Sequence, residues 1–176
     1  MPVHLGLTIL LIDSTDWKDR LNRSEVYLCC HFEYRERSNE RSYVSVVKGG
    51  GCSSLLGMYG GRQQISLGSG CYSQGTIIHE FIHAIGFDHE QSRPDRDNYV
   101  KIMWGNIQGG RDNDNFWKAN GWKMFDTEYD WRSVMHYRAY NGASINGGPT
   151  ITSIVSKDWP DKKVTIYSPI FYLLSI

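Results

Sequence analysis

The chain has 176 residues, of which 40% are hydrophobic, and it carries 19 basic and 19 acidic side chains. This length is sufficient for one domain with a core of its own. The formal charge of zero argues against nucleic acid as the main partner, because binding phosphates requires a basic surface. It also argues against a polybasic membrane-binding surface, and no apolar run approaches the roughly 20 residues of a membrane span. We therefore expect no nucleic-acid partner and no membrane partner.

The first half of the chain is predicted to be rich in β-structure. Residues 5–12 are predominantly apolar, but they lack a preceding Lys or Arg and a small-residue cleavage site, so we do not predict a signal peptide. A buried strand explains this run equally well. Two further strands are predicted over 43–47 and 63–67, because each is followed by a glycine-rich turn. A helix is predicted from about residue 76 to residue 85. After Asp88, frequent Trp, Asn, Asp and Gly residues indicate irregular structure.

The chain contains four cysteines, Cys29, Cys30, Cys52 and Cys71. An even number is compatible with disulfides and an oxidising compartment, and four reduced, buried thiols are the alternative. Adjacent cysteines would close a strained ring, which argues against a bond between Cys29 and Cys30. Cys52 and Cys71 flank a glycine-rich stretch, so a disulfide between them would close a loop of moderate length.

The predicted helix carries the sequence His79-Glu80-x-x-His83. Two histidines four residues apart lie on one face of a helix, so both imidazoles can reach the same ion. With about 100° per residue, the apolar side chains of this segment fall on the opposite side of the helix. This separation indicates one face for the core and another for a ligand. A histidine-bearing surface helix is the alternative interpretation.

Downstream of the two histidines, the sequence provides a turn and a third imidazole. Gly86 can adopt the positive φ that commonly ends a helix, after which the chain can return His89 to the same side. Three imidazoles suit Zn²⁺ with one position left open for water, whereas a structural zinc site usually has four ligands rich in cysteine. The extended motif is followed by Met135 in the sequence SVMHY, and a methionine turn behind such a motif is the second mark of metzincin proteases.

Residues 79–100, HEFIHAIGFDHEQSRPDRDNYV, together with the later SVMHY, resemble the astacin family of zinc metallopeptidases. The family signature has glutamate directly after the third histidine, and this chain has Glu90 there. The glycine and cysteine pattern over residues 51–71 is also similar to that of the family. The resemblance extends over about residues 29–152.

The resemblance implies a role for each residue of the motif. Three histidines would bind one Zn²⁺ ion: His79, His83 and His89. Glu80 would be the catalytic base, and Tyr137 would be a further zinc ligand whose phenol leaves the metal when substrate binds and then stabilises the oxyanion. Met135 would form a hydrophobic floor below the metal, and Cys52–Cys71 would be the shorter family disulfide. Residues 64–67 would belong to an edge strand that pairs with an extended peptide substrate.

The implied fold class is α+β, a metzincin-like protease domain of two lobes within residues 1–176. We expect an N-terminal lobe, 1–89, with a sheet and the zinc helix, and an irregular C-terminal lobe, 90–176. The implied activity is secreted, zinc-dependent endopeptidase activity on protein or peptide substrates. No cysteine follows Cys71 to complete the long family disulfide from Cys29, and the last helix of the family has no counterpart. We therefore expect a truncated chain with an incomplete C-terminal lobe, and a non-catalytic zinc-binding protein is the alternative.

Overall fold

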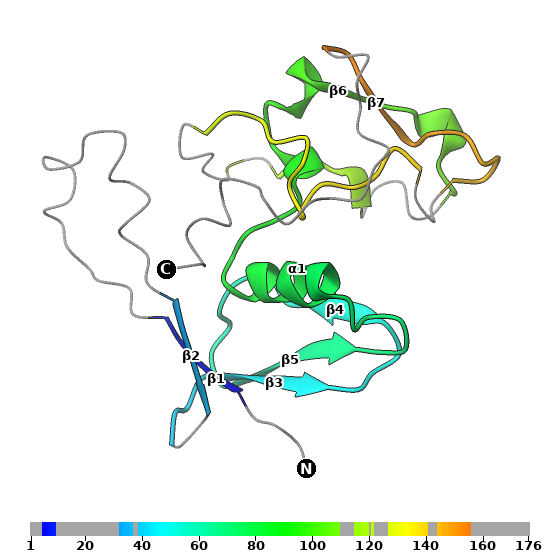
Figure 1. Cartoon of the computed structure of the whole chain (residues 1–176). Helices are drawn as coiled ribbons and strands as arrows, with labels where there is room; N and C mark the ends of the chain where they lie inside the picture. Colours follow the sequence, from blue (N-terminus) through cyan, green and yellow to red (C-terminus); the bar gives the residue numbers. More distant parts are fainter. Residues whose placement is uncertain are drawn as a thin grey trace, which may run out of the picture. The chain divides into compact units, whose positions relative to one another are not determined.

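The computed structural model describes residues 5–9, 32–36, 39–109, 115–119, 121, 127–140 and 144–155 (Figure 1). The described residues up to Phe87 form one compact unit, and those from Asp88 onward form a second. The expectations about Cys29, Cys30 and the C-terminal end of the chain lie outside the described residues. None of the helices among the described residues has both the length and the apolar character needed to cross a membrane.

The first unit begins with a pair of antiparallel strands. β1 (Leu5–Ile9) pairs with β2 (Phe32–Glu36), with Leu5 opposite Glu36 and Ile9 opposite Phe32. The apolar run at the start of the chain therefore contains a strand, which is one of the two interpretations that its sequence left open. The burial of that strand stays a prediction.

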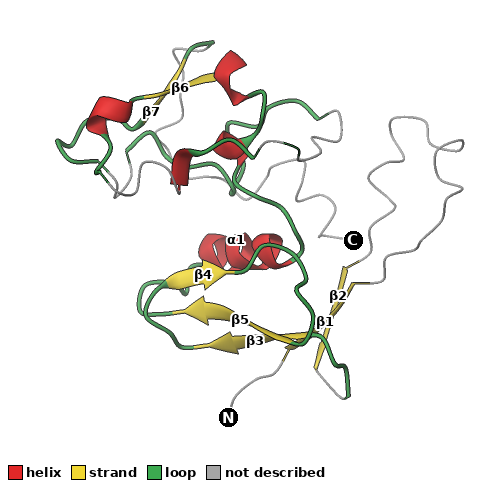
Figure 2. Ribbon diagram, turned by 180° about the vertical axis from the view of Figure 1, so that it is seen from behind, coloured by secondary structure: helices red, strands yellow, loops and turns green. Residues whose placement is uncertain are grey.

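Residues 43–84 of the first unit form a three-stranded sheet covered by one helix, as Figure 2 shows. β3 (Tyr43–Val47) runs parallel to β5 (Arg62–Leu67), and β4 (Cys52–Ser54) runs antiparallel to β5 on its other side. Both predicted strands are confirmed, β5 with one additional residue at its start. Apolar side chains of the sheet, of the helix and of the loop that joins them form a core: Val44, Ile65, Leu67, Cys71, Phe81 and Ala84.

The expectation that residues 64–67 form an edge strand is wrong. The strand order is β3-β5-β4, so β5 is the central strand of the sheet. Ile65 and Leu67 pair with β4, and residues 62–66 pair with β3. The backbone groups of β5 therefore bond to both neighbouring strands. The edge strand that lies next to the helix is β4. The expectation failed because Cys52–Ser54 is too short and too polar to be recognised as a strand from its pattern.

Helix α1 (Gln74–Ala84) confirms the predicted helix, beginning two residues earlier and ending one residue earlier than expected. Ser73 is its N-cap, and the Ser73 hydroxyl accepts a hydrogen bond from the Thr76 N–H at 3.2 Å. The chain leaves the helix at Gly86, whose φ of 105° is readily adopted only by glycine. The carbonyl oxygen of His83 accepts hydrogen bonds from the N–H groups of Gly57 and Gly86, which satisfies the end of the helix.

Among its described residues, the second unit consists mostly of turns, as the composition predicts. The regular elements there include three short 3₁₀ helices, η2 (Glu90–Ser92), η3 (Arg96–Asn98) and η4 (Trp104–Asn106), and the antiparallel strands β6 (Val100–Ile102) and β7 (Ile151–Ser153). The two strands bring together segments that are far apart in the sequence. Val100, Ile102 and Ile151 of these strands form a core together with residues from other segments, namely Ile107, Phe116 and Tyr129.

Candidate metal centre

Three histidines come together in the structure as the motif predicts. His79 and His83 lie one turn apart on α1, and His89 follows the turn at Gly86. The candidate ligand nitrogens of the three imidazoles all lie within 4.8 Å of one another. Within the part of the chain that the structure describes, no cysteine or carboxylate joins this group. Three imidazoles without a fourth protein ligand of these types are the donor set of a zinc site with an open position.

The orientation of the His83 ring is fixed by the turn that follows the helix. Its Nδ1 atom lies 2.9 Å from the carbonyl oxygen of Phe87. A carbonyl oxygen only accepts hydrogen bonds, so Nδ1 must carry the proton. The lone pair of the ring is therefore on Nε2, which is the atom available to a metal. A hydrogen bond from the second nitrogen to a backbone carbonyl is the usual way in which proteins orient a metal-binding imidazole.

The spacing of the first two imidazoles fits a shared cation. The Nε2 atoms of His79 and His83 are 3.0 Å apart, and the two rings meet edge to face. Two nitrogens that each bind zinc at 2.0–2.1 Å in a tetrahedral arrangement lie roughly 3.3 Å apart. Two lone pairs at such a distance repel each other unless a cation or a proton lies between them. The arrangement therefore matches the donor geometry that zinc requires.

Two carboxylates accompany the histidines. Glu80 follows His79 directly on α1, and only 4% of its surface is exposed. The Asp88 carboxylate accepts a hydrogen bond from the backbone N–H of His89 at 2.7 Å and lies 3.5 Å from the Nδ1 atom of the same residue. Asp88 thus holds the backbone of the third histidine, and its charge lies beside the imidazole.

The segment after the third histidine binds the methionine turn directly. The N–H of Glu90 donates to the carbonyl oxygen of Met135 at 3.1 Å, and the N–H of Tyr137 donates to the side-chain oxygen of Gln91 at 2.9 Å. Met135 is 3% exposed, in agreement with a buried role for this side chain. The ring of Tyr137 lies against that of His89, with 4.6 Å between the ring centroids. The structure thus brings Tyr137 to a predicted metal ligand.

A buried histidine and a buried tyrosine form hydrogen bonds with the methionine turn. The Tyr129 hydroxyl lies 2.7 Å from Nε2 of His136, and Nδ1 of His136 lies 2.6 Å from the carbonyl oxygen of Tyr137. The carbonyl must be the acceptor, so Nδ1 carries the proton and Nε2 accepts from the Tyr129 hydroxyl. Burial lowers the pKa of His136 to about 4, which keeps the ring neutral at neutral pH, and burial raises the pKa of Tyr129 above its usual range.

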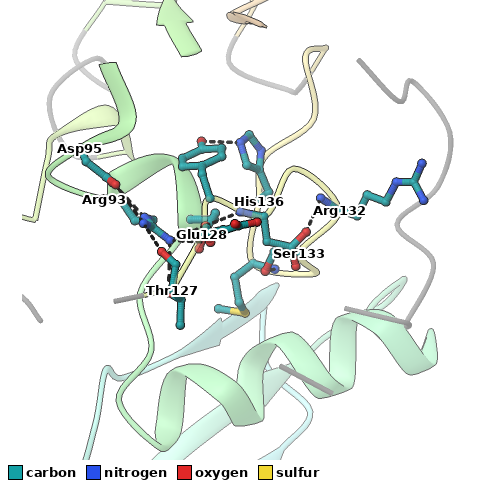
Figure 3. Close-up of polar contacts among 11 residues, drawn as sticks. Arg93, Asp95, Thr127, Glu128, Arg132, Ser133 and His136 are labelled. Atoms are coloured by element: carbon teal, nitrogen blue, oxygen red, sulfur yellow. Dashed lines mark hydrogen bonds and ion pairs between the residues drawn. The ribbon is translucent and has the colours of Figure 1, made fainter. Parts of the chain in front are cut away.

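A network of ionic hydrogen bonds around Arg93 holds the loop that leads into the methionine turn (Figure 3). The Arg93 guanidinium donates two hydrogen bonds to Asp95, both at 2.9 Å, and it also donates to the carbonyl oxygens of Thr127 and Glu128. Glu90 accepts from Arg93 at 3.1 Å and from the N–H of Asp130 at 2.8 Å. Burial raises the pKa of Glu90, and the two hydrogen bonds oppose this increase.

Sequence reasoning does not find the supporting residues of the site. Gln91 and His136 stand out only as members of a signature, and Tyr129 does not stand out at all. Gln91 contacts Tyr137, which is more than 40 residues away in the sequence. Tyr129 contacts His136, which is seven residues away. The only signal in the sequence is that polar residues stand next to the predicted ligands.

The model of the peptidase family Astacin matches residues 12–165. The chain belongs to the astacin family. Blastula protease 10 of Paracentrotus lividus is 46% identical over 144 residues, which cover 77% of this chain and 24% of that protein. Zinc metalloproteinase nas-13 of Caenorhabditis elegans is 46% identical over 132 residues, which cover 69% of this chain and 29% of that protein.

A solved structure of an astacin-like enzyme supports the same fold. High choriolytic enzyme 1, a hatching enzyme zinc-protease from Oryzias latipes, superposes with a TM-score of 0.65 at 44% identity, covering 69% of this chain and 60% of that chain. The α+β metzincin fold expected from the sequence is thereby confirmed, and zinc is the cofactor of this astacin. The chain spans about a quarter of the length of the first two curated relatives.

Proposed function

We propose that the chain is a zinc-dependent endopeptidase that hydrolyses peptide bonds in extended protein substrates. The observation that carries this proposal is the convergence of three histidine nitrogens, two of them from the helix that also carries the buried residue Glu80. His79, His83 and His89 would hold the zinc ion, and Tyr137 would be a further ligand because its ring lies against His89. Bound zinc would polarise the scissile carbonyl and lower the pKa of water toward about 7.

The chain's own residues supply the proton transfers. Glu80 would accept the proton of the attacking water and then donate it to the leaving amine, which is general base and general acid catalysis by one group. A carboxylate suits this role because it has acceptor oxygens when ionised and an O–H donor when protonated. The Tyr137 phenol would donate a hydrogen bond to the oxygen on which negative charge develops.

Substrate would bind along the edge of the first unit's sheet. β4 is an outer strand of that sheet, and it lies beside α1, which carries His79 and His83 (Figure 1). An outer strand uses the backbone groups of only one of its sides within its own sheet, so an extended peptide can add as a further strand on the other side. Because backbone pairing is independent of side-chain identity, this mode suits peptides of varied sequence.

We also propose that the two units are the lobes of a single peptidase domain, and that the protein acts in an extracellular compartment. The disulfide between Cys52 and Cys71 supports the second point, because disulfides persist mainly in oxidising compartments. The pairing of these two cysteines is the one that the resemblance implied, and the structure confirms it.

A cleavage assay with a matched variant tests the proposed function. The purified chain, supplied with zinc, is incubated with an unfolded protein, and new peptide termini are identified by mass spectrometry. We expect cleavage by the unmodified chain, inhibition by a zinc chelator, and no cleavage by Glu80→Gln at unchanged zinc content, because an amide cannot accept the proton. Absence of cleavage by the zinc-loaded chain would contradict the proposal and favour a non-catalytic zinc-binding protein. Undiminished cleavage by Glu80→Gln would contradict the role of Glu80.

A further inference from the structure

We propose that Gln91 is a positioning residue of the peptidase site, which holds the backbone of Tyr137 so that the ring stays against the predicted ligand His89. This inference rests on the proposed function, because it concerns the residue that would stabilise the oxyanion. It adds to that function a side chain that itself touches neither metal nor substrate.

The contact between the two residues is direct and fully enclosed. Gln91 is 0% exposed, and its side-chain oxygen accepts the N–H of Tyr137 at 2.9 Å. The backbone of Gln91 is itself held, because its carbonyl oxygen accepts a hydrogen bond from the buried guanidinium of Arg96 at 3.0 Å. The acceptor for Tyr137 therefore projects from a fixed backbone. A hydrogen bond inside a water-excluded core is not exchanged for one with solvent.

The other side of Tyr137 is held as well. Its carbonyl oxygen accepts from Nδ1 of His136 at 2.6 Å, and the His136 ring is in turn bonded to the Tyr129 hydroxyl. Both backbone polar groups of Tyr137 thus bond to buried side chains rather than to a helix or strand. The Tyr137 ring lies between the rings of His89 and Phe116, at centroid distances of 4.6 and 5.8 Å. These two bonds hold the backbone of Tyr137 at its N–H and at its carbonyl oxygen, and the ring contacts complete the placement of the phenol.

The amide of Gln91 is used through its oxygen alone. Its Nε2 atom is buried and has no hydrogen-bond partner among the described residues. A buried donor without a partner costs free energy, so this side chain is not optimised for stability of the core. The role of the side chain is therefore to accept the hydrogen bond from Tyr137 with its oxygen. Substitutions can remove the oxygen and the nitrogen of the amide separately.

Three variants separate the acceptor from the packing. Gln91→Met has a similar length but no side-chain oxygen at that position, so it removes the acceptor. Gln91→Glu keeps an acceptor oxygen there and replaces the nitrogen that has no partner with a second oxygen, which carries either a proton or a buried negative charge. Gln91→Asn withdraws the acceptor by one methylene, and it takes the place of Gln91→Met if that variant does not fold. Thermal unfolding of each variant establishes that it is folded.

The first readout is hydrogen exchange of the Tyr137 amide in the metal-free chain, which does not require enzymatic activity. We expect exchange to be about tenfold faster or more in Gln91→Met, and close to that of the unmodified chain in Gln91→Glu, because a protected amide exchanges when its hydrogen bond opens. Unchanged exchange in Gln91→Met would overturn the proposal. This readout stands even if the chain cleaves no peptide, so failure of the proposed function and failure of this inference are distinguishable.

The second readout is a double-mutant cycle with Tyr137→Phe. We expect Gln91→Met to lower kcat by about tenfold or more with little change in KM, because misplacing a group that acts in the transition state reduces kcat. In the Tyr137→Phe background the same substitution should have an effect of less than about twofold, because the phenol that it positions is already absent. Equal losses of kcat in both backgrounds would show a role in general stability only and would overturn the proposal.

Discussion

The N–H of Glu90 donates a hydrogen bond to the carbonyl oxygen of Met135 at 3.1 Å, which joins the segment after the third histidine directly to the methionine turn. Both residues are buried. A backbone hydrogen bond of this kind does not depend on which side chains the two positions carry. It aligns the two segments so that Gln91 meets Tyr137 and the ring of His89 meets the Tyr137 ring. The position of Tyr137 thus follows from how residues 89–91 are held.

The N-cap of α1 should contribute measurably to stability. Ser73 accepts the Thr76 N–H at 3.2 Å, and no other backbone acceptor is available in the first turn of a helix. We expect Ser73→Ala to lower the free energy of unfolding by about 1 kcal/mol. Ser73→Asp should retain most of this contribution, because aspartate is also a good N-cap. Chemical denaturation of the three proteins measures the difference. A Ser73→Ala variant as stable as the unmodified chain would contradict this assignment.

Gly68 should not tolerate a side chain. A Cβ atom there would lie 2.7 Å from the carbonyl oxygen of Gly49 and 2.7 Å from the nitrogen of Gly51, and both are backbone atoms that cannot rotate away. We expect Gly68→Ala to lower the free energy of unfolding by about 1–3 kcal/mol. Gly50→Ala is the matched control, because nothing lies within 4 Å of its added Cβ. Equal stabilities of the two alanine variants would show that the close approach at Gly68 is absent.

The disulfide should stabilise the unit that carries α1. Cys52 and Cys71 are bonded at a sequence separation of 19, for which loop closure gives about 3 kcal/mol in the chain-entropy account. We expect Cys52→Ser to lower the free energy of unfolding by an amount of this order. Cys52 is exposed whereas Cys71 is buried in the core, so the substitution at Cys52 removes the bond with little change in packing.

Reduction of the unmodified chain is the control for that substitution. Treatment with a thiol reductant should lower its denaturation midpoint by the same amount as Cys52→Ser and should leave the variant unaffected. A midpoint of the unmodified chain that does not respond to complete reduction would contradict a stabilising role of the bond.

Local patterns were sufficient to predict the elements that carry the histidines. The helix of His79 and His83 has a serine cap, an apolar face and a terminal glycine, all between Ser73 and Gly86, so its prediction required no tertiary information. The strands β3 and β5 were predictable for the same reason. The return of His89 required only the turn at Gly86.

The strand order and the support of Tyr137 could not be predicted in this way. The central position of β5 depends on its pairing with Cys52–Ser54, three residues with no apolar alternation of their own. The acceptor for the Tyr137 N–H is Gln91, which is distant in the sequence and belongs to a 3₁₀ turn without periodicity. Neither contact leaves a local signal, because each is determined by how whole segments meet.

The metal content of the purified chain tests the central claim most directly. After incubation with zinc and removal of the free ion, elemental analysis should find one zinc ion per chain, because three imidazole nitrogens converge within 4.8 Å of one another. His83→Ala should reduce the zinc content to nearly zero. His4 lies outside the motif, so His4→Ala should keep one zinc ion per chain. An unmodified chain that binds no zinc, or a His83→Ala variant that still binds one ion per chain, would contradict the account.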